Sequence, residues 1–282
     1  MALRPFQILT LFAAALWLGG LHPAVAQSQT ASAWQRQQHS AARLISAEAE
    51  KGREGTVWRA GVEITLDPGW KTYWRNPGDS GIPPRFNFSA STNVRDVKVA
   101  WPAPARFADG VGMSIGYADR VILPLRIRPR DPAAPVVLRL KLDYAVCEKL
   151  CVPVDVAMDL PLGTARTAFD DALKASEARV PRKGLIGDEG TLSITAVRRV
   201  TTPKPAVLVD VHGPGGTDLF VEGPNERWNL PLPDPVGGAP PGVQRFVFAL
   251  DGIPPDAKIA GAQFTLTAVS SGEAVEAAFH LD

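Results

Sequence analysis

The chain has 282 residues, of which 45% are hydrophobic, and its 30 basic and 29 acidic residues leave a formal net charge of +1. Nucleic-acid-binding proteins carry a basic excess or a basic stripe, and because this chain has neither, its composition argues against a nucleic-acid partner. The length is enough for two ordinary domains. Two cysteines are too few to form the disulfide framework of so long a chain.

Residues 1–26 have the pattern of a secretory signal peptide. One charged residue, Arg4, precedes an apolar run over residues 8–21, and Ala24-Val25-Ala26 is a small-x-small cleavage site. The run is shorter than the roughly 18 apolar residues that a membrane-spanning helix needs, and no later run reaches that length. We therefore expect export and cleavage, with a mature chain that does not span the membrane. An uncleaved signal anchor is the alternative.

Short segments with β-strand patterns follow as far as Gly163. Turn sequences such as Asp67-Pro68-Gly69 and Arg130-Asp131-Pro132 separate them. Many short strands with little helix favour an all-β fold, and we predict an immunoglobulin-like β-sandwich as a first domain of residues 27–163. Its expected strands before the cysteines are Ala42–Ala49, Val57–Leu66, Arg85–Phe88, Val94–Trp101 and Val121–Arg128.

One connection, residues 69–84, is unusually long and rich in aromatic residues, proline and glycine. Loops of more than about 12 residues without secondary structure are uncommon, and most are functional or disordered. Trp70, Tyr73 and Trp74 argue against disorder, so we predict a loop that packs on another part of the protein. Two interpretations remain open: the aromatic side chains plug the open end of the sandwich, or they form a lid over the cysteines.

The stretch over residues 138–160 holds both cysteines of the chain, Cys147 and Cys151. Apolar and polar residues alternate on either side of the pair, which predicts two half-buried strands joined by a loop at residues 148–150. Both cysteines are expected on the polar face, accessible to solvent. Residues opposite each other in such a hairpin have Cα atoms roughly 4.5–5.5 Å apart, within the range that a disulfide tolerates.

Three roles for this pair remain open from its spacing. A disulfide that closes so short a loop stabilises a protein by only roughly 2 kcal/mol, which makes it a poor structural link and favours redox exchange over a structural disulfide. Two thiolates followed by Pro153 also suit the soft ion Cu(I). The sequence has no nucleophile elbow, zinc-protease motif or phosphate-binding loop, so no other catalytic chemistry is indicated.

The pattern changes after Gly163. Apolar residues at helical spacing predict an amphipathic helix over residues 165–180, within a helical linker of residues 164–185. Residues 186–282 have strand patterns again and form a second β-domain, sandwich-like, whose role the sequence does not reveal. Its expected strands are Thr191–Val200, Ala206–Val211, Leu219–Glu222, Val243–Leu250, Gln263–Val269 and Ala274–Leu281.

Several motifs occur in an order that resembles a known family. They are the stretch GWKTYWRNPG at residues 69–78, Trp101-Pro102, Ile115-Gly116-Tyr117, Tyr144-Ala145-Val146-Cys147 and Cys151-Val152-Pro153. Together they resemble the amino-terminal periplasmic domain of the thiol:disulfide interchange protein DsbD, and more closely that of its relative ScsB, the suppressor-of-copper-sensitivity protein. The resemblance is firm over residues 34–163 and loose beyond them.

The resemblance implies an immunoglobulin-like periplasmic domain whose cysteine pair cycles between dithiol and disulfide, with no cofactor besides that redox-active pair. In the family, electrons come from a membrane-embedded domain through a thioredoxin-like domain. They pass to periplasmic disulfide isomerases or cytochrome c maturation proteins. An aromatic cap loop shields the cysteines, and by position it matches the stretch around Tyr73, Trp74 and Arg75 in the block that begins near Trp70. Tyr117 approaches the site only if the fold matches that of the family.

Two departures from the family pattern affect these expectations. The pair here is C-x3-C, shorter than the C-x5-C of typical DsbD, so the geometry and potential of the ring are expected to differ. The sequence also contains no membrane domain and no thioredoxin-like domain, so we expect a separately encoded membrane protein as the electron donor.

The expected mechanism is thiol–disulfide exchange, in which one cysteine attacks a partner disulfide as a thiolate and the other resolves the mixed disulfide. We favour Cys147 as the attacking residue and Cys151 as the resolving one, although the residues do not decide the order. Lys149 favours a thiolate electrostatically and Glu148 opposes it, so their net effect is open. Pro153, directly after the motif, is a further supporting candidate.

Overall fold

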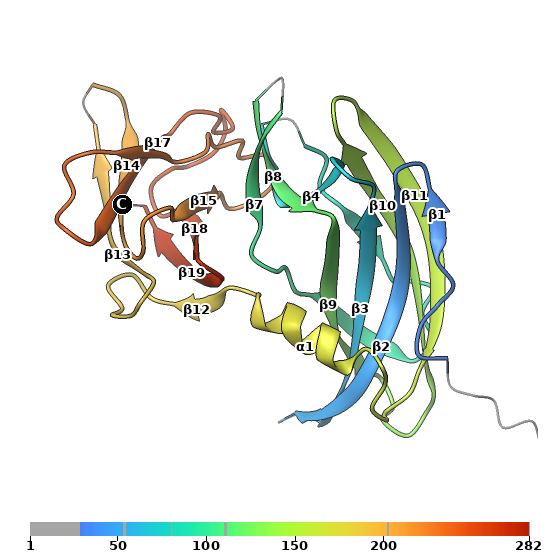
Figure 1. Ribbon diagram of the computed structural model, residues 1–282. Coiled ribbons are helices and arrows are strands. Elements are labelled where there is room, and N and C mark those ends of the chain that lie inside the picture. Colours follow the sequence, from blue (N-terminus) through green and yellow to red (C-terminus); the bar gives the residue numbers. More distant parts are fainter. Residues whose placement is uncertain (1–28, 53–54, 80, 110–111, 202, 282) are drawn as a thin grey trace, which may run out of the picture.

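The computed structural model describes residues 29–52, 55–79, 81–109, 112–201 and 203–281. Within these ranges almost all regular structure is β, arranged as two sandwiches with one helix, α1 (Asp170–Ala178), on the connection between them (Figure 1). This confirms the all-β prediction. The predicted signal peptide, residues 1–26, lies outside the described residues. No helix in the described ranges is long and apolar enough to cross a membrane.

The first sandwich packs a five-stranded sheet against a six-stranded sheet. The first sheet has the order β1-β2-β3-β9-β6, with β1 at Gln35–Gln37, β2 at Ser40–Gly52, β3 at Gly55–Leu66, β9 at Arg120–Pro129 and β6 at Val94–Val99. The second has the order β11-β10-β4-β8-β7, with β11 at Cys151–Leu162, β10 at Val136–Cys147, β4 at Lys71–Gly78, β8 at Gly112–Ala118 and β7 at Ala105–Asp109. A short strand, β5 (Arg85–Asn87), also pairs with β10.

Alternate side chains of both sheets fill the space between them. In β10 the predicted apolar face is confirmed. Leu138, Leu140, Leu142 and Tyr144 are all buried in this core, while the alternate residues Arg139, Lys141 and Asp143 are exposed. Such period-2 burial is what a strand with one face on a core requires. The hairpin of β10 and β11 is therefore fixed in register by its buried face.

The stretch over residues 69–84 is not the long loop that its composition predicts. Residues 71–78 form β4, which pairs with β10 on one side and with β8 on the other. The pairing with β8 matches Tyr73 to Gly116 and then jumps to Gly78 and Ser114, so the strand contains a bulge. A bulge interrupts the alternation of side chains, which is why the strand has no clear pattern in the sequence.

The helix is shorter than the predicted span of residues 165–180. It begins at Asp170, whose carboxylate accepts hydrogen bonds from the backbone N–H groups of Thr167 and Glu48 at 2.6 and 3.1 Å. These bonds hold the preceding residues in a turn. Leu173 is fully buried on the outer side of the first sheet, against Ile45 and Ile122.

The second sandwich consists of two four-stranded sheets. The first has the order β12-β19-β18-β15, with β12 at Arg182–Gly184, β19 at Glu273–His280, β18 at Gln263–Ser270 and β15 at Asp218–Glu222. The second has the order β13-β14-β17-β16, with β13 at Ser193–Val200, β14 at Ala206–His212, β17 at Val243–Ala249 and β16 at Asp234–Val236. All six predicted strands of this region are present. Two further strands, β12 and β16, were not predicted. Strand β12 falls within the predicted linker, yet it pairs in parallel with β19 as part of the second sandwich.

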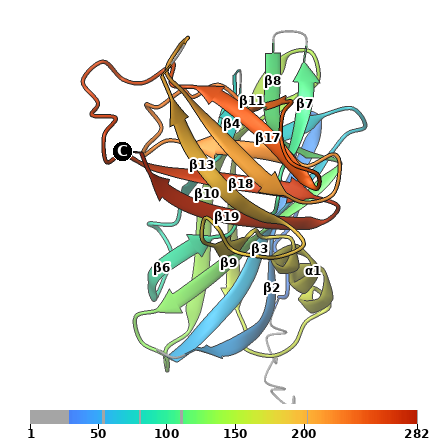
Figure 2. The same ribbon diagram turned by 90° about the vertical axis from the view of Figure 1, so that its left-hand side faces the viewer.

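The two sandwiches are in direct contact (Figures 1 and 2). Strand β15 lies beside β7 in Figure 1, and the carbonyl of its Val221 accepts a hydrogen bond from Asn76 of β4. Phe220 of β15 is fully buried and belongs to the core of the first sandwich, where its ring centroid lies 5.8 Å from that of Trp74. Arg106 of β7 also donates to the backbone carbonyls of Leu219 and Pro233, each at 3.2 Å. Figure 2 views the molecule with the second sandwich in front of the first.

Candidate functional site

The tip of the β10–β11 hairpin places the two cysteines opposite each other. Cys147 and Cys151 are the last pair of a register that begins at Val136 and Leu162, and residues 148–150 close the turn. This confirms the predicted hairpin and its loop. Neither cysteine is in a disulfide, and their Sγ atoms lie 2.8 Å apart. A small change of side-chain torsion is therefore sufficient to bring them to bonding distance.

The cysteines are less accessible than the sequence predicts. Cys147 is only 5% exposed, and Cys151 is half-buried. The polar face of a strand was expected to lie open to solvent, but Tyr73 of the neighbouring strand β4 covers this part of the hairpin. Tyr73, Ala145 and Cys147 form a small apolar cluster outside the main core, with Cys151 packed at its edge.

Tyr73 is placed over the sulfurs by strand pairing. Thr72 pairs with Val146 and Lys71 with Cys147, so the side chain of Tyr73 lies on the same face of the sheet as Cys147. The hydroxyl of Thr72 fixes the register further by donating to the carbonyl of Ala145 at 2.9 Å. The register leaves the Tyr73 hydroxyl 3.0 Å from the Sγ atom of Cys151.

The Tyr73 hydroxyl keeps its proton at neutral pH. Burial, followed by hydrogen bonding to Cys151 and Cys147, raises the pKa of Tyr73 well above its usual value of 10.0. Between a hydroxyl and a thiol, either group can be the donor. When Cys151 is a thiolate only the hydroxyl can donate, so Tyr73 then supplies a hydrogen bond to the sulfur anion.

The other three predicted cap residues lie in three different parts of the structure. Trp74 points to the opposite face of β4 and is fully buried in the main core. Trp70 is half-buried and stacks on the ring of His39, with 3.8 Å between the ring centroids. Arg75 extends to the second sandwich, where it contacts Glu222. Of these four residues, Tyr73 is the one whose side chain contacts a cysteine in the described part of the chain.

Of the remaining predicted site residues, Tyr117 lies away from the cysteines, whereas Glu148, Lys149 and Pro153 lie beside them. Tyr117 is buried in the main core, where burial raises its pKa, and its hydroxyl donates to the carbonyl of Pro102 at 2.8 Å. Glu148, Lys149 and Pro153 are exposed around the hairpin tip.

Leu150, which the sequence analysis did not single out, is 75% exposed at this tip. An apolar residue in a polar hairpin turn, between two cysteines, was the signal that could have identified it.

Comparison with known proteins agrees with this geometry. Residues 41–162 match the family model described as "Thiol:disulfide interchange protein DsbD, N-terminal". The first sandwich thus matches the DsbD amino-terminal family. This confirms the resemblance that the sequence motifs indicated. A search of curated proteins found no match to the chain.

The fold is similar to a solved structure described as the N-terminal periplasmic domain of ScsB from Proteus mirabilis. The TM-score is 0.70 at 21% sequence identity, and the match covers 89% of this chain and 98% of that one. Coverage of 89% is more than residues 41–162 alone can provide, so the similarity includes the second sandwich as well as the DsbD-like sandwich.

The DsbD-like sandwich places the two thiols of Cys147 and Cys151 side by side. In the described ranges, no group of three or more His, Cys, Asp or Glu residues is placed to hold a metal ion. Two thiols that face each other support the formation, opening and exchange of a disulfide between Cys147 and Cys151.

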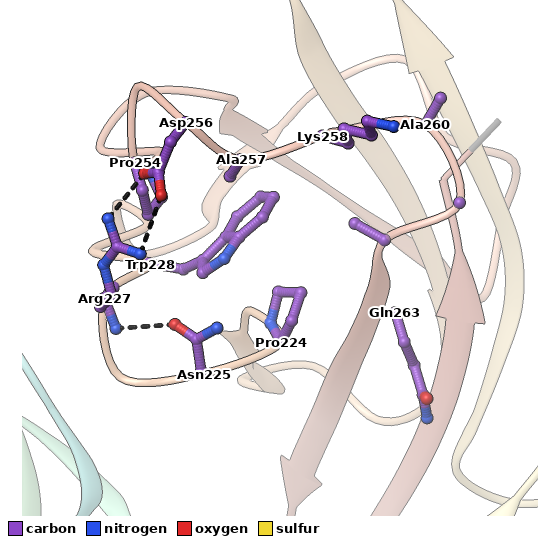
Figure 3. A pocket seen from close by; sticks show the side chains of 12 residues that line it. Pro224, Asn225, Arg227, Trp228, Pro254, Asp256, Ala257, Lys258, Ala260 and Gln263 are labelled. Atoms are coloured by element: carbon purple, nitrogen blue, oxygen red, sulfur yellow. Dashed lines mark hydrogen bonds and ion pairs between the residues drawn. The ribbon is translucent and has the colours of Figure 1, made fainter.

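A separate depression lies in the second sandwich (Figure 3). Its volume is about 500 Å³, and the indole of Trp228 lies among its lining residues together with Pro224 and Pro254. Arg227 and Asp256 form an exposed ion pair at its rim, with 2.6 Å between Nη2 and Oδ1. Its lining residues lie between Pro224 and Gln263, so this depression is separate from β4 and from the cysteine hairpin of the DsbD-like sandwich.

Proposed function

We propose that this chain is a periplasmic thiol–disulfide exchange protein that carries reducing equivalents through Cys147 and Cys151 to the disulfides of exported proteins. The observation that carries the proposal is the position of the two thiols, which face each other at 2.8 Å between their Sγ atoms at the tip of a hairpin. The match of this sandwich to a thiol:disulfide interchange family supports it. The predicted signal peptide and the periplasmic relative support the location.

The alternative of a structural disulfide has less support. The strands β10 and β11 are paired along twelve residue positions, up to the cysteines themselves. A covalent bond at the end of this ladder closes a loop that the ladder already closes, and a loop of this size contributes only roughly 2 kcal/mol through chain entropy. The half-exposed Cys151 is, in contrast, positioned to meet the sulfur of another protein.

The exposure of the two thiols favours Cys151 as the residue that meets the partner. This order is the reverse of the one that the sequence analysis favoured, and its basis is that Cys147 is buried and Cys151 half-buried. In the reaction, the Cys151 thiolate attacks one sulfur of the partner disulfide, and the other partner sulfur leaves as a thiolate that takes up a proton. Cys147, after losing its proton, then attacks Cys151 and releases the second partner thiol. The dithiol is oxidised to a disulfide, and two electrons reduce the partner.

Tyr73 affects both cysteines of the pair. Its ring covers Cys147, and its hydroxyl donates to Cys151 when that sulfur carries the negative charge. The ring thereby limits the access of small oxidants and thiols to the reduced pair. A partner protein must approach Cys151 from the side that Tyr73 leaves open.

We further propose partners of the thiol-redox class. A membrane protein with a thioredoxin-like domain serves as the electron donor, and periplasmic disulfide isomerases or cytochrome c maturation proteins serve as acceptors. The exposed Leu150 lies between the two cysteines and provides an apolar contact for such a partner.

The proposal is tested by the reduction potential of the Cys147–Cys151 pair. The mature protein is equilibrated in glutathione or dithiothreitol buffers, and its free thiols are counted. We expect a value between roughly −270 and −120 mV, the range of exchange-active pairs. A value below about −300 mV is typical of structural disulfides and would refute the exchange function. Cys147→Ser should trap mixed disulfides through Cys151 with exported proteins, and Cys151→Ser should trap far fewer.

A further inference from the structure

The half of β4 that follows Tyr73 is paired with its own sheet only at its end, Gly78. Pairing with β8 ends at Tyr73 and Gly116 and resumes only at Gly78 and Ser114. Pairing with β10 covers Lys71 and Thr72 alone. Residues 74–77 therefore lie outside both ladders, directly after the residue that covers the cysteines. Trp74 is held by its burial in the main core, so Arg75, Asn76 and Pro77 are the residues whose position depends on other contacts.

The second sandwich provides these contacts. Arg75 donates from Nε and Nη2 to the two carboxylate oxygens of Glu222, at 2.8 and 2.6 Å, and from Nη2 to Glu276 at 2.6 Å. The amide of Asn76 donates to the carbonyl of Val221 at 2.9 Å. Glu222 and Val221 belong to β15 and Glu276 to β19, so both contacts cross from the first sandwich to the second.

This contact is charged and partly shielded from water. Burial alone would lower the pKa of Arg75, but hydrogen bonding and the charges of Glu222 and Glu276 outweigh it and raise the pKa, so the guanidinium stays charged. Burial likewise acts to raise the pKa of Glu276, but Lys183 and Arg75 together hold the pKa below its usual value of 4.5. Charge-assisted bidentate bonds of this kind are stronger than neutral hydrogen bonds.

The contact lies at the edge of the interface and not in a core. The side chain of Arg75 is 26% exposed. It lines a cleft of about 730 Å³ between the two sandwiches, together with Pro77, Gly81 and Glu222. Such a contact can open without unfolding either sandwich, because local opening needs only the loss of bonds at the surface.

Pro77 of this segment is linked to Tyr73 through Gly81. A Cβ atom built on Gly81 would lie 2.6 Å from Cδ1 of the Tyr73 ring and 2.3 Å from Cβ of Pro77. The backbone at Gly81 therefore lies against the ring, and Pro77 lies against that backbone. A chain of contacts runs from Glu222 through Arg75 to Pro77, from Pro77 through Gly81 to the Tyr73 ring, and from Tyr73 to Cys151.

We propose that the second sandwich acts as a clamp on β4, in which Arg75 is the positioning residue that keeps Tyr73 over Cys147 and Cys151. Release of Arg75 from Glu222 and Glu276 frees residues 75–77 and with them the contact between Pro77 and Gly81, and the Tyr73 ring that Gly81 packs on then moves off the sulfurs. The role of the second sandwich is to set how readily the thiols are reached. That this access controls disulfide exchange rests on the proposed function. The clamp itself is a structural property that does not depend on it.

The test is the alkylation rate of the reduced protein by iodoacetamide, measured on Arg75→Gln and, from the other side of the interface, on Glu222→Gln. Loss of a charge-assisted hydrogen bond shifts such an opening equilibrium by about tenfold, so we expect both variants to alkylate about tenfold faster than the wild type. Arg75→Lys, which keeps the charge, should restore much of the protection. The matched control is Arg227→Gln, which breaks the exposed pair with Asp256 within the second sandwich (Figure 3) and should leave the rate unchanged.

Circular dichroism separates a clamp from general unfolding. Arg75→Gln and Glu222→Gln should melt below Arg227→Gln, because they remove a partner from a partly buried charge cluster, but their spectra at the assay temperature should be those of the folded wild type. Folded variants that alkylate at the wild-type rate would overturn the proposal, as would an equal acceleration in Arg227→Gln. Because alkylation needs no disulfide partner, the result is independent of the reduction potential. A potential below about −300 mV would remove the exchange function and leave the clamp standing.

Discussion

Replacing Tyr73 by phenylalanine removes one hydroxyl, 3.0 Å from the Sγ atom of Cys151, and leaves the ring in place. In the reduced protein this hydroxyl bonds to the sulfur, and a disulfide sulfur is a weaker acceptor. The variant therefore loses stability mainly in its reduced form. One hydrogen bond contributes about 1 kcal/mol, and for a two-electron couple about 1.4 kcal/mol corresponds to 30 mV. We expect the reduction potential to become more negative by about 20 mV.

The assay is equilibration in dithiothreitol buffers at pH 7, followed by counting of free thiols. Tyr117→Phe is the matched control, because its hydroxyl is also buried but donates to the carbonyl of Pro102, and its potential should equal that of the wild type. An unchanged or less negative potential in Tyr73→Phe would show that the hydroxyl does not stabilise the reduced sulfur. Tyr73→Ala, which also removes the ring, should in addition make Cys147 accessible to alkylating reagents.

Three further predictions concern the surroundings of this site. Leu150→Asp should slow exchange with thioredoxin, used as a protein probe, several-fold and leave the rate with dithiothreitol unchanged; equal effects on both would exclude a docking role. Gly81→Ala should displace the Tyr73 ring and speed alkylation, whereas Gly237→Ala, with open space around it, should not. The depressed pKa of Glu276 means that the folded state binds its proton less tightly than the unfolded state, so its contribution to stability is present above about pH 4.5 and is lost below it. Urea unfolding from pH 6 to pH 3 should therefore show a shallower loss in Glu276→Gln, and parallel curves would contradict the assignment.

The parts of the fold that the sequence predicts are those in which local pattern and tertiary environment agree. The β10–β11 hairpin follows strict alternation, and its register was predicted to the residue, with Cys147 opposite Cys151. The strand β4 was missed because a bulge interrupts its alternation and because its second half is held by another domain.

The burial of Cys147 and the position of Arg75 were not predictable for a related reason. A strand pattern tells which face a residue occupies, but not that a ring from a neighbouring strand covers that face. The partner of Arg75 is Glu222, which is 147 residues away in the chain, and nothing local to either residue indicates the pairing. Contacts of this kind depend on how two domains dock, which single-sequence periodicity does not encode.

The burial of Phe220 has a consequence for how the chain can be divided experimentally. This residue is carried by the second sandwich, but it is fully buried in the core of the first, beside Trp74. A fragment that ends before residue 164 would contain both cysteines and yet lack one of its own core side chains, with Trp74 left facing the gap. Removing a buried Phe side chain from a core destabilises proteins by about 3–5 kcal/mol, a large part of the stability of an ordinary domain. Redox measurements on such a fragment would describe a loosened site, so the boundary that is convenient for cloning is not the boundary of the folded unit.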